Sequence, residues 1–269
     1  MASDNKDIRA LDELFNEVGT YRNSTDLKEL FMFIKRFPKI APYNAFLLHI
    51  QKPGSQYVAS APTWKQEFNR TIKPGARPLV MLKPFGPVDF VFELEDTMGE
   101  DPFPDELLHP FQTEGVLSSN SFNNLILNLS RDNISYSESD HGTQSAGFIQ
   151  KTGKGTYGLV VNKNHSTEVK FSTIAHELGH LYCGHLGTPN EKWWPNRSNI
   201  MDSSIREFEA ESVAWLVCQR HGLNAPSASY LSSYLNTNAP VPSISLETIL
   251  KAARMIEEMA QKRMRPRKI

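Results

Sequence analysis

The feature that most constrains this chain is the pentapeptide HELGH at residues 176–180, inside a run that predicts a helix over about 167–184. Residues four positions apart lie on one face of a helix, so His176 and His180 project together with Glu177 beside them. Imidazoles at this spacing bind one Zn²⁺ ion, and a neighbouring carboxylate serves as a general base. The motif therefore predicts one catalytic zinc per chain. The competing interpretation is two histidines packed on a helix beside a solvated carboxylate.

A catalytic zinc site needs a third protein ligand and an open position for water. The downstream segment REFEAESVAW, residues 206–215, supplies three glutamates on a predicted helix over about 204–221. Glu207 and Glu211 share one face of that helix, whereas Glu209 points elsewhere. We expect Glu207 to be the third ligand and Glu211 to accept a hydrogen bond from the Nδ1–H of a ligand histidine. Glu209 is the alternative ligand, and a solvated acidic face is the competing interpretation.

Two other residues near the motif are not expected to bind this metal. His185 lies five residues after His180, which rotates it about 140° around a helix, so it joins the same face only if the helix ends first. The longer metzincin pattern requires Gly and His where Cys183 and Leu186 stand, which disfavours a three-histidine site. Cys183 and Cys218 are the only cysteines, so no disulfide framework is available and a reducing compartment fits.

The composition is that of a folded, water-soluble chain. Its 269 residues are 39% hydrophobic and 22% charged, with a formal net charge of −1, and this length suits two modest domains. The longest apolar runs fall short of the roughly 18–20 residues of a membrane-spanning helix. The first twenty residues lack the basic start and apolar run of a signal peptide. We expect a cytoplasmic protein with no membrane partner.

Charge is distributed unevenly along the chain. Residues 22–83 contain eleven Lys or Arg and three Asp or Glu, whereas residues 84–140 contain twelve acids and one Arg. Such blocks either steer a polyanion toward one face or attract each other within the fold. The Pro-rich acidic run at 95–111 has the composition of a linker. We therefore expect one domain over residues 1–105 and a second over 115–269.

Hydrophobic periodicity predicts an α+β fold. The predicted helices cover residues 8–18, 27–37, 43–51, 121–129, 167–184, 204–221 and 245–264, and the predicted strands cover 56–59, 78–82, 88–94, 146–150 and 158–162. Residues 151–157 are expected to form the turn between the last two strands. We expect an extended substrate to bind along the edge of the strand over 157–162. The basic C-terminal run QKRMRPRKI is expected to be a frayed end.

The predicted zinc site implies peptide hydrolysis. Zinc lowers the pKa of bound water toward neutrality and polarises a substrate carbonyl, while Glu177 takes the water's proton and returns it to the leaving amine. A donor to the oxyanion is expected from a Tyr, His or Arg. Tyr182, His221, Tyr230 and Tyr234 are the candidates, and the sequence does not choose among them.

The segments AHELGHLYCGH and EFEAESVAWLV resemble the zincin-like metallopeptidase domain shared by ImmA/IrrE proteins and ArdC-type antirestriction proteins. The N-terminal part is similar to the N-terminal domain of ArdC-type proteins. The similar segments are residues 42–84 and 92–99, with a Tyr-Asn near the start of a helix, Gln-x-Pro, Trp-Lys, an Arg before Lys-x-Gly, and an acidic-x-Thr-x-Gly end. The resemblance covers residues 27–234.

This resemblance implies an N-terminal domain that binds single-stranded DNA, followed by a zincin-like domain with a small sheet and active-site helices. It implies that the protein protects incoming DNA of a mobile element, a plasmid, from restriction. The DNA-binding positions carried over are Asn44, Gln51, Trp64, Lys65, Arg70 and Lys73. The basic segment agrees in part, because aromatic platforms with phosphate-pairing cations bind single strands.

Two alternatives to this function remain open. The first is an ImmA/IrrE-like regulatory protease that cleaves a repressor protein, with an N-terminal domain that recognises protein. The second is a non-proteolytic single-stranded-DNA-binding module in which zinc is structural or dispensable. The intact Glu177 argues against the second, because a purely structural zinc site has no use for a general base.

Overall fold

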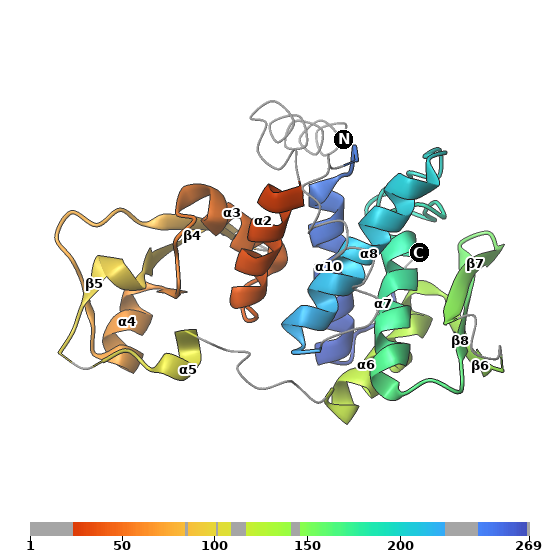
Figure 1. Cartoon of the computed structure of the whole chain (residues 1–269), viewed down its shortest axis with the longest axis horizontal. Helices are drawn as coiled ribbons and strands as arrows, with labels where there is room; N and C mark the ends of the chain where they lie inside the picture. The colour runs from red at the N-terminus through yellow and green to blue at the C-terminus, as the bar shows by residue number, and fades with distance from the viewer. Residues whose placement is uncertain are drawn as a thin grey trace. The chain divides into compact units, whose positions relative to one another are not determined.

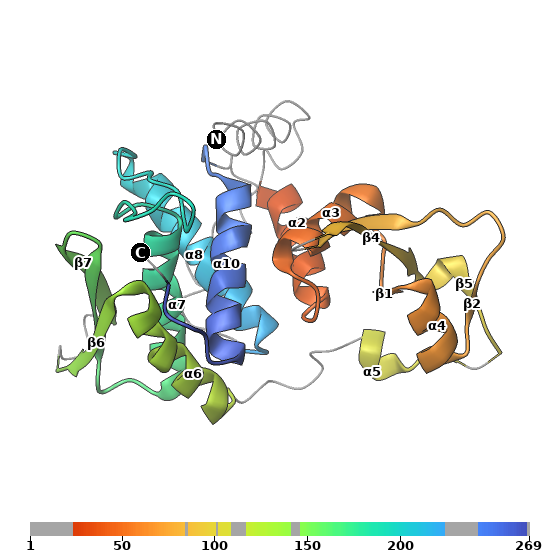
Figure 2. The same ribbon diagram turned by 180° about the vertical axis from the view of Figure 1, so that it is seen from behind.

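The computed structural model describes residues 24–83, 86–100, 102–108, 117–140, 146–223 and 242–267. The chain divides into two compact units, an N-terminal unit over residues 29–113 and a C-terminal unit built mainly from the residues after 113. Each unit combines helices with a small sheet, which confirms the α+β prediction (Figures 1 and 2). No helix among the described residues is long and apolar enough to cross a membrane. The helix predicted over 8–18 lies outside the described residues.

The N-terminal unit combines helices with short antiparallel strands. Its main sheet has the strand order β1-β4-β3, and β2 pairs separately with β5. Its core includes the fully buried side chains Phe31, Ile34, Phe46 and Trp64. The elements are α2 (Ser24–Arg36), in which the unit begins, α3 (Pro42–Gln51), β1 (Val58–Ala59), α4 (Ala61–Phe68), β2 (Thr71–Ile72), β3 (Leu79–Lys83), β4 (Gly86–Glu93), η1 (Leu94–Asp96), β5 (Thr97–Met98) and α5 (Asp105–Leu108).

Sequence periodicity located α2, α3, β3 and β4 but missed α4. Ser60 caps that helix by accepting a hydrogen bond from the backbone N–H of Thr63, and Pro62 lies in the first turn, where proline is tolerated. The helix has eight residues, of which Trp64 alone is buried, so it leaves almost no periodic signal. The strand predicted over 56–59 is shorter than expected, because only Val58 and Ala59 pair with β4.

In the part of the C-terminal unit that the structure describes, four helices pack beside a three-stranded sheet. Helix α7 contacts β7 and β8 as well as α8, while α10 contacts α6, α7 and α8 (Figures 1 and 2). Its core includes Leu159, Ile174, Leu178, Val213 and Ile256, all fully buried. The elements are α6 (Ser119–Leu129), η2 (Ser130–Asp132), β6 (Ile134–Ser139), β7 (Gly147–Gly153), β8 (Thr156–Asn162), α7 (Thr167–Tyr182), α8 (Ser203–Arg220) and α10 (Leu246–Gln261).

Strand β8 lies in the middle of its sheet, so the prediction that residues 157–162 offer a free edge is wrong. The order is β6-β8-β7, with β6 parallel and β7 antiparallel to β8. Sequence analysis missed β6, which occupies one side of β8 and leaves the outer side of β7 as the edge beside α7. The turn between β7 and β8 is also shorter than predicted and passes through Gly155, whose φ of +73° favours glycine.

The C-terminal run is not frayed over residues 262–267, contrary to the prediction. The Asn128 side chain accepts a hydrogen bond from the backbone N–H of Met264 at 2.9 Å. Arg267 pairs with the buried Asp132 at 2.5 Å, and its guanidinium lies 5.2 Å from the ring centroid of Trp193. These partners belong to α6, η2 and the loop after α7. Arg267 therefore packs against the C-terminal unit and does not extend a charged surface.

Candidate functional site

Helices α7 and α8 face each other closely where the HELGH segment lies. Gly179 permits this approach, because a Cβ atom there would lie 3.0 Å from both the Cα and the carbonyl oxygen of Ala210 on α8. Ser166 begins α7 by accepting a hydrogen bond from the backbone N–H of Val169, and Asp202 caps α8 in the same way for Ser204. The packing therefore places Glu207 and Glu211 of α8 opposite the histidines of the HELGH segment.

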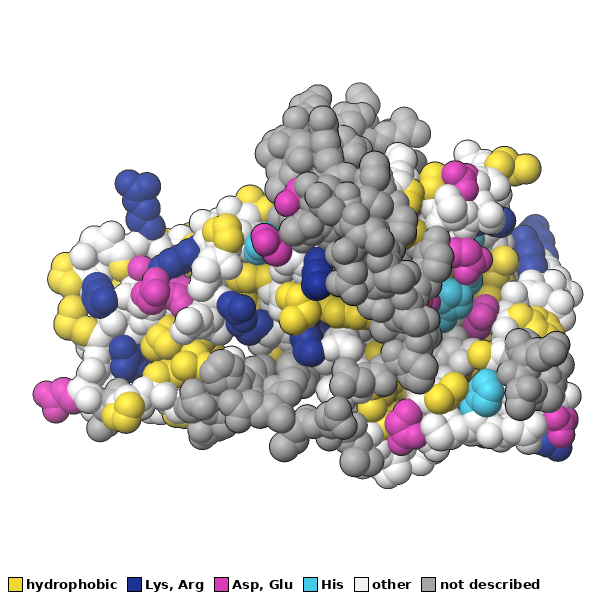
Figure 3. Space-filling view, in the orientation of Figure 1, with side chains coloured by type: hydrophobic (Ala, Val, Ile, Leu, Met, Phe, Trp, Pro, Cys, Tyr) yellow, Lys and Arg dark blue, Asp and Glu magenta, His cyan; other side chains and the backbone are white. Residues whose placement is uncertain are grey.

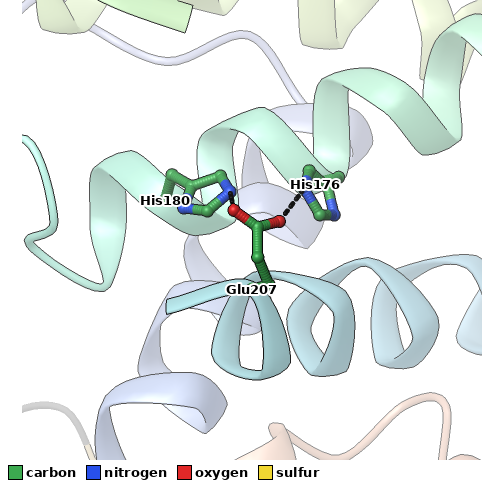
Figure 4. Close-up of side chains that lie close together, drawn as sticks. All are labelled: His176, His180 and Glu207. Atoms are coloured by element: carbon green, nitrogen blue, oxygen red, sulfur yellow. Dashed lines mark ion pairs between the residues drawn. The ribbon is translucent and has the colours of Figure 1, made fainter. Parts of the chain in front are cut away.

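The predicted ligands His176, His180 and Glu207 converge on one point (Figure 4). One Glu207 oxygen lies 3.4 Å from His176 Nε2, and the other lies 3.5 Å from His180 Nε2. One ligand atom from each residue falls within 4.8 Å of the others. Two imidazole nitrogens and a carboxylate are the donor set of catalytic zinc sites, so these residues fit the metal. The imidazoles of His176 and His180 beside it hold the pKa of Glu207 below its usual range.

The outer nitrogen of His176 is also partnered. His176 Nδ1 lies 3.0 Å from an oxygen of Glu211, whose side chain is 7% exposed. An ionised carboxylate only accepts hydrogen bonds, so Nδ1 carries the proton and Nε2 presents its lone pair toward Glu207. Glu211 thus stands where the spacing predicts a carboxylate that orients a ligand histidine.

Glu177 lines the same cavity as the three ligands. This cavity measures about 310 Å³ and is lined by Ile149, His176, Glu177, His180, His185, Leu186, Arg206 and Glu207. The backbone N–H of Ile149 on β7 donates to a Glu177 oxygen at 3.0 Å. Burial raises the pKa of Glu177 to about 7, against the opposing influence of His176. A carboxyl group with a pKa near neutrality beside a metal site is suited to exchange protons with water and substrate.

His185 reaches His180 because the helix ends between them. Helix α7 stops at Tyr182, and Gly184 adopts a φ of +85° in the left-handed region. The backbone N–H of His185 then donates to the carbonyl of His180, and that of Gly184 donates to the carbonyl of Leu181, both at 3.0 Å. This pair of bonds is the Schellman motif, which turns the chain back along the helix. His185 Nδ1 consequently lies 3.0 Å from His180 Nδ1.

Glu209, the alternative ligand, points away from the cavity ligands into the protein. Its side chain is fully buried, and Arg197 donates to both of its oxygens at 2.6 and 2.7 Å. The backbone N–H of Ser245 and the Nε2 of His185 complete its partners. Burial alone would raise the pKa of Glu209, but hydrogen bonds from His185 and Arg197 outweigh burial and lower it.

We expect Arg197→Met to lower the free energy of unfolding by about 3–5 kcal/mol at pH 7, because it leaves a buried carboxylate short of its cation. A group whose pKa is lowered by folding stabilises the protein above its unfolded pKa, about 4.3 for Glu, and loses that contribution below it. The difference in the free energy of unfolding between wild type and variant should therefore have its full size at pH 7 and become smaller below about pH 4. Urea unfolding at both pH values measures it.

Arg254→Met is the matched control for this prediction. Arg254 pairs with Glu258 on the surface of α10, and exposed pairs of this kind contribute little. We expect this control to change stability by less than about 0.5 kcal/mol at either pH. An Arg197→Met protein as stable as the control would show that the buried pair does not hold this part of the fold.

The structure removes two of the predicted oxyanion donors. The buried Tyr182 hydroxyl donates to Asp132, and His221 donates to the carbonyl of Val217, so neither lines the cavity. Tyr230 and Tyr234 lie outside the described residues. Sequence analysis missed Arg206, which lines the cavity and whose buried Nε has no hydrogen-bond partner among the described atoms. Its signal in the sequence is its place next to the ligand Glu207.

The C-terminal part of the chain is similar to a known protein family. Residues 134–263 match the sequence model of a peptidase family described as the IrrE N-terminal-like domain. This range lies within the C-terminal unit. All the candidate metal ligands and Glu177 lie inside the matched range, and the match supports a metallopeptidase-like C-terminal unit, as the sequence resemblance implied. The residues proposed to bind DNA lie outside the matched range.

One solved structure similar to the chain is the Mn(II)-bound crystal structure of the antirestriction protein ArdC from plasmid R388. It shares 16% sequence identity, with 82% of this chain and 86% of that chain covered and a TM-score of 0.37. A search of curated proteins finds no significant match.

The structure gives three of the predicted DNA-binding residues internal partners. The side-chain amides of Asn44 and Gln51 on α3 pair with the backbone of Leu82 and Val80 along the edge of β3, each donating one hydrogen bond and accepting one. Trp64 is fully buried, and its indole N–H donates to a backbone carbonyl on β4. Trp64 is therefore a core residue of the N-terminal unit and does not offer its ring face to a base.

The three predicted DNA-binding cations lie closer to the surface. Lys65 and Lys73 are exposed, and the Lys73 ammonium donates to the backbone carbonyl of Glu95 at 2.7 Å. Arg70 is half-buried and donates to the Thr97 hydroxyl at 2.8 Å. Part of the basic block is neutralised by the acidic block that follows it, because Lys52 pairs with Asp96 and Lys83 with Asp89. Figure 3 shows Lys and Arg side chains among carboxylates on this face of the N-terminal unit.

Proposed function

We propose that this protein is a zinc-dependent metallopeptidase that hydrolyses peptide bonds in the cavity beside α7, α8 and β7. The observation that carries the proposal is the convergence of His176, His180 and Glu207 in a cavity that Glu177 also lines. The imidazole of His176 is held by a carboxylate on its far side, as a catalytic metal site requires. The match to a peptidase family over residues 134–263 supports the same function.

The chain's own residues divide the work of hydrolysis. A bound zinc ion supplies Lewis acidity and lowers the pKa of a water molecule. Glu177 accepts the proton of the attacking water and returns it to the leaving amine. The free edge of β7 offers backbone groups to an extended peptide, and Ile149 places this edge next to Glu177. Among the residues that line the cavity, Arg206 carries a guanidinium group, and we assign it as the hydrogen-bond donor to the carbonyl oxygen of the substrate.

Metal content and peptidase activity test this function together. The purified protein, depleted of metal and reloaded with Zn²⁺ or Mn²⁺, should retain about one ion of the added metal per chain by elemental analysis and cleave members of a mixed peptide library. Mn²⁺ is included because the similar ArdC structure contains it. A His176→Ala, His180→Ala double variant serves as the ligand-free control. Wild-type protein that retains no more metal than this control would overturn the proposal.

We further propose that the N-terminal unit binds single-stranded DNA and that the protein acts in antirestriction. The resemblance of residues 42–84 and 92–99 to ArdC-type proteins supports this role, as do the surface positions of Lys65 and Lys73. Exposed cations contribute to sequence-independent binding through the release of counterions from phosphates.

We expect Lys65→Ala with Lys73→Ala to weaken single-stranded-DNA binding and to reduce the slope of log K against log salt by about 1.4, since each phosphate contact contributes about 0.7. Fluorescence anisotropy with a labelled oligonucleotide at several salt concentrations measures the slope. Lys83→Ala is the matched control, because Lys83 already pairs with Asp89. An unchanged slope in the double variant would exclude these lysines from the interface.

The alternative that the structure favours next is a regulatory protease that cleaves a repressor protein. Its support is that the side chains of Asn44, Gln51 and Trp64 donate hydrogen bonds to the backbone within the N-terminal unit. Peptidase activity in a protein that fails to bind single-stranded DNA at low salt would favour this alternative over the antirestriction role.

A further inference from the structure

A chain of buried hydrogen bonds runs from the candidate ligand His180 to a buried carboxylate. His180 Nδ1 lies 3.0 Å from His185 Nδ1, and His185 Nε2 lies 2.8 Å from Glu209. The side chains of His185 and Glu209 are 1% and 0% exposed, so water does not compete for these bonds. Beyond Glu209 the chain ends at Arg197, which binds both carboxylate oxygens.

The acceptor at the far end determines where the hydrogens lie. Glu209 is ionised beside Arg197 and only accepts, so His185 carries its hydrogen on Nε2. A neutral imidazole protonated on Nε2 has an unprotonated Nδ1, which in turn accepts from His180. His180 therefore carries its hydrogen on Nδ1, and its Nε2 keeps the lone pair that faces Glu207 at 3.5 Å.

We propose that His185 is a positioning residue that fixes the tautomer and the ring orientation of the metal ligand His180. The inference rests on the proposed metal centre and adds a residue that its ligand set does not contain. The other ligand, His176, is held directly by Glu211, whereas His180 is held by a neutral imidazole with its carboxylate one residue further away. This arrangement orients the second ligand without placing another charge against the cavity.

The same residues do not form a second metal site. Cys183, His185 and Glu209 lie close enough together to hold an ion. However, Arg197 already supplies the positive charge at Glu209, and burial raises the pKa of the Cys183 thiol well above its usual range. A neutral thiol is a poor metal ligand, because the thiolate is the binding form. We therefore interpret this cluster as a hydrogen-bonding partner of His180 and not as a second metal site.

Zinc affinity, measured by competition with a chromophoric chelator, tests the role of His185 without any substrate. We expect His185→Leu to weaken zinc binding about 10- to 100-fold, the usual effect of removing a hydrogen-bond partner of a ligand histidine. His185→Asn places an amide oxygen near the position of Nδ1 and should restore a large part of this loss. The visible spectrum of the Co²⁺-loaded proteins reports ligand geometry, and we expect it to change in His185→Leu only.

Two further measurements separate positioning from folding. Thermal unfolding of the metal-free variants shows whether each protein is folded, and His165→Leu is the control for loss of a histidine outside the cavity lining. If His185→Leu binds zinc as tightly as wild type, the positioning role is wrong while the metal centre stands. Equal losses of affinity in the Leu and Asn variants would also overturn it, since they indicate packing rather than hydrogen bonding. If wild type binds no metal, both this inference and the proposed function fail.

Discussion

Replacing Glu177 with glutamine is expected to lower kcat about 10²- to 10⁴-fold while zinc content stays at the wild-type level. Glutamine keeps the size of the side chain and still accepts the hydrogen bond from Ile149, but it does not take a proton from water. The base acts as a carboxylate, so wild-type activity should rise as the pH passes upward through its pKa. Burial places that pKa at about 7, and a bound divalent cation would move the midpoint lower.

The control for this experiment is Glu168→Gln, which changes an exposed glutamate in the first turn of the same helix. We expect it to leave both rate and metal content unchanged. Rates on a peptide that the wild type cleaves, together with elemental analysis of each protein, provide the comparison. A Glu177→Gln protein with the control's activity would remove Glu177 from the mechanism and leave the metal centre unaffected.

Replacing Arg206 with alanine is expected to lower kcat about 10²- to 10³-fold, the usual effect of removing one donor to a developing oxyanion. Arg206 lines the cavity next to Glu207, which places its guanidinium where it can donate to a substrate carbonyl. Arg206→Lys keeps the charge but lacks the forked guanidinium, and it should recover only part of the rate. Steady-state kinetics on the same peptide measure these effects.

The division between kcat and KM decides what Arg206 does. A loss confined to kcat indicates an interaction made in the transition state, whereas a higher KM with unchanged kcat indicates ordinary substrate binding and contradicts the oxyanion role. Arg254→Ala, at a surface pair on α10, should change neither parameter.

Local sequence was sufficient to predict the elements that carry the site. The spacing of His176 and His180 requires a helix to bring both imidazoles to one face, and α7 supplies it. The four-residue separation of Glu207 and Glu211 likewise distinguished the glutamates that face α7 from Glu209. These predictions succeed because helical periodicity is a property of neighbouring residues.

The sequence misled at Trp64, which matches a DNA-binding pattern but is fully buried, with its indole N–H bonded to the backbone of β4. Asn44 and Gln51 stay at the surface, and their side-chain amides bond to the backbone of β3. A residue that matches a family motif can serve either to stabilise the fold or to bind a ligand at the surface. The motif alone does not distinguish these two roles. Which strand has the free edge was also hidden, because β6 pairs with β8 across a sequence separation that periodicity does not reach.

The sequence by itself predicted the residues of the proposed metal centre, two histidines and a glutamate suited to zinc with a candidate general base beside them. Only the tertiary structure decided which groups support that chemistry. The left-handed turn at Gly184 brings His185 against His180, and the packing of α8 brings Arg206 into the cavity. The physical reason is that ligand spacing follows from a single helix, whereas these supporting contacts depend on how separate segments meet.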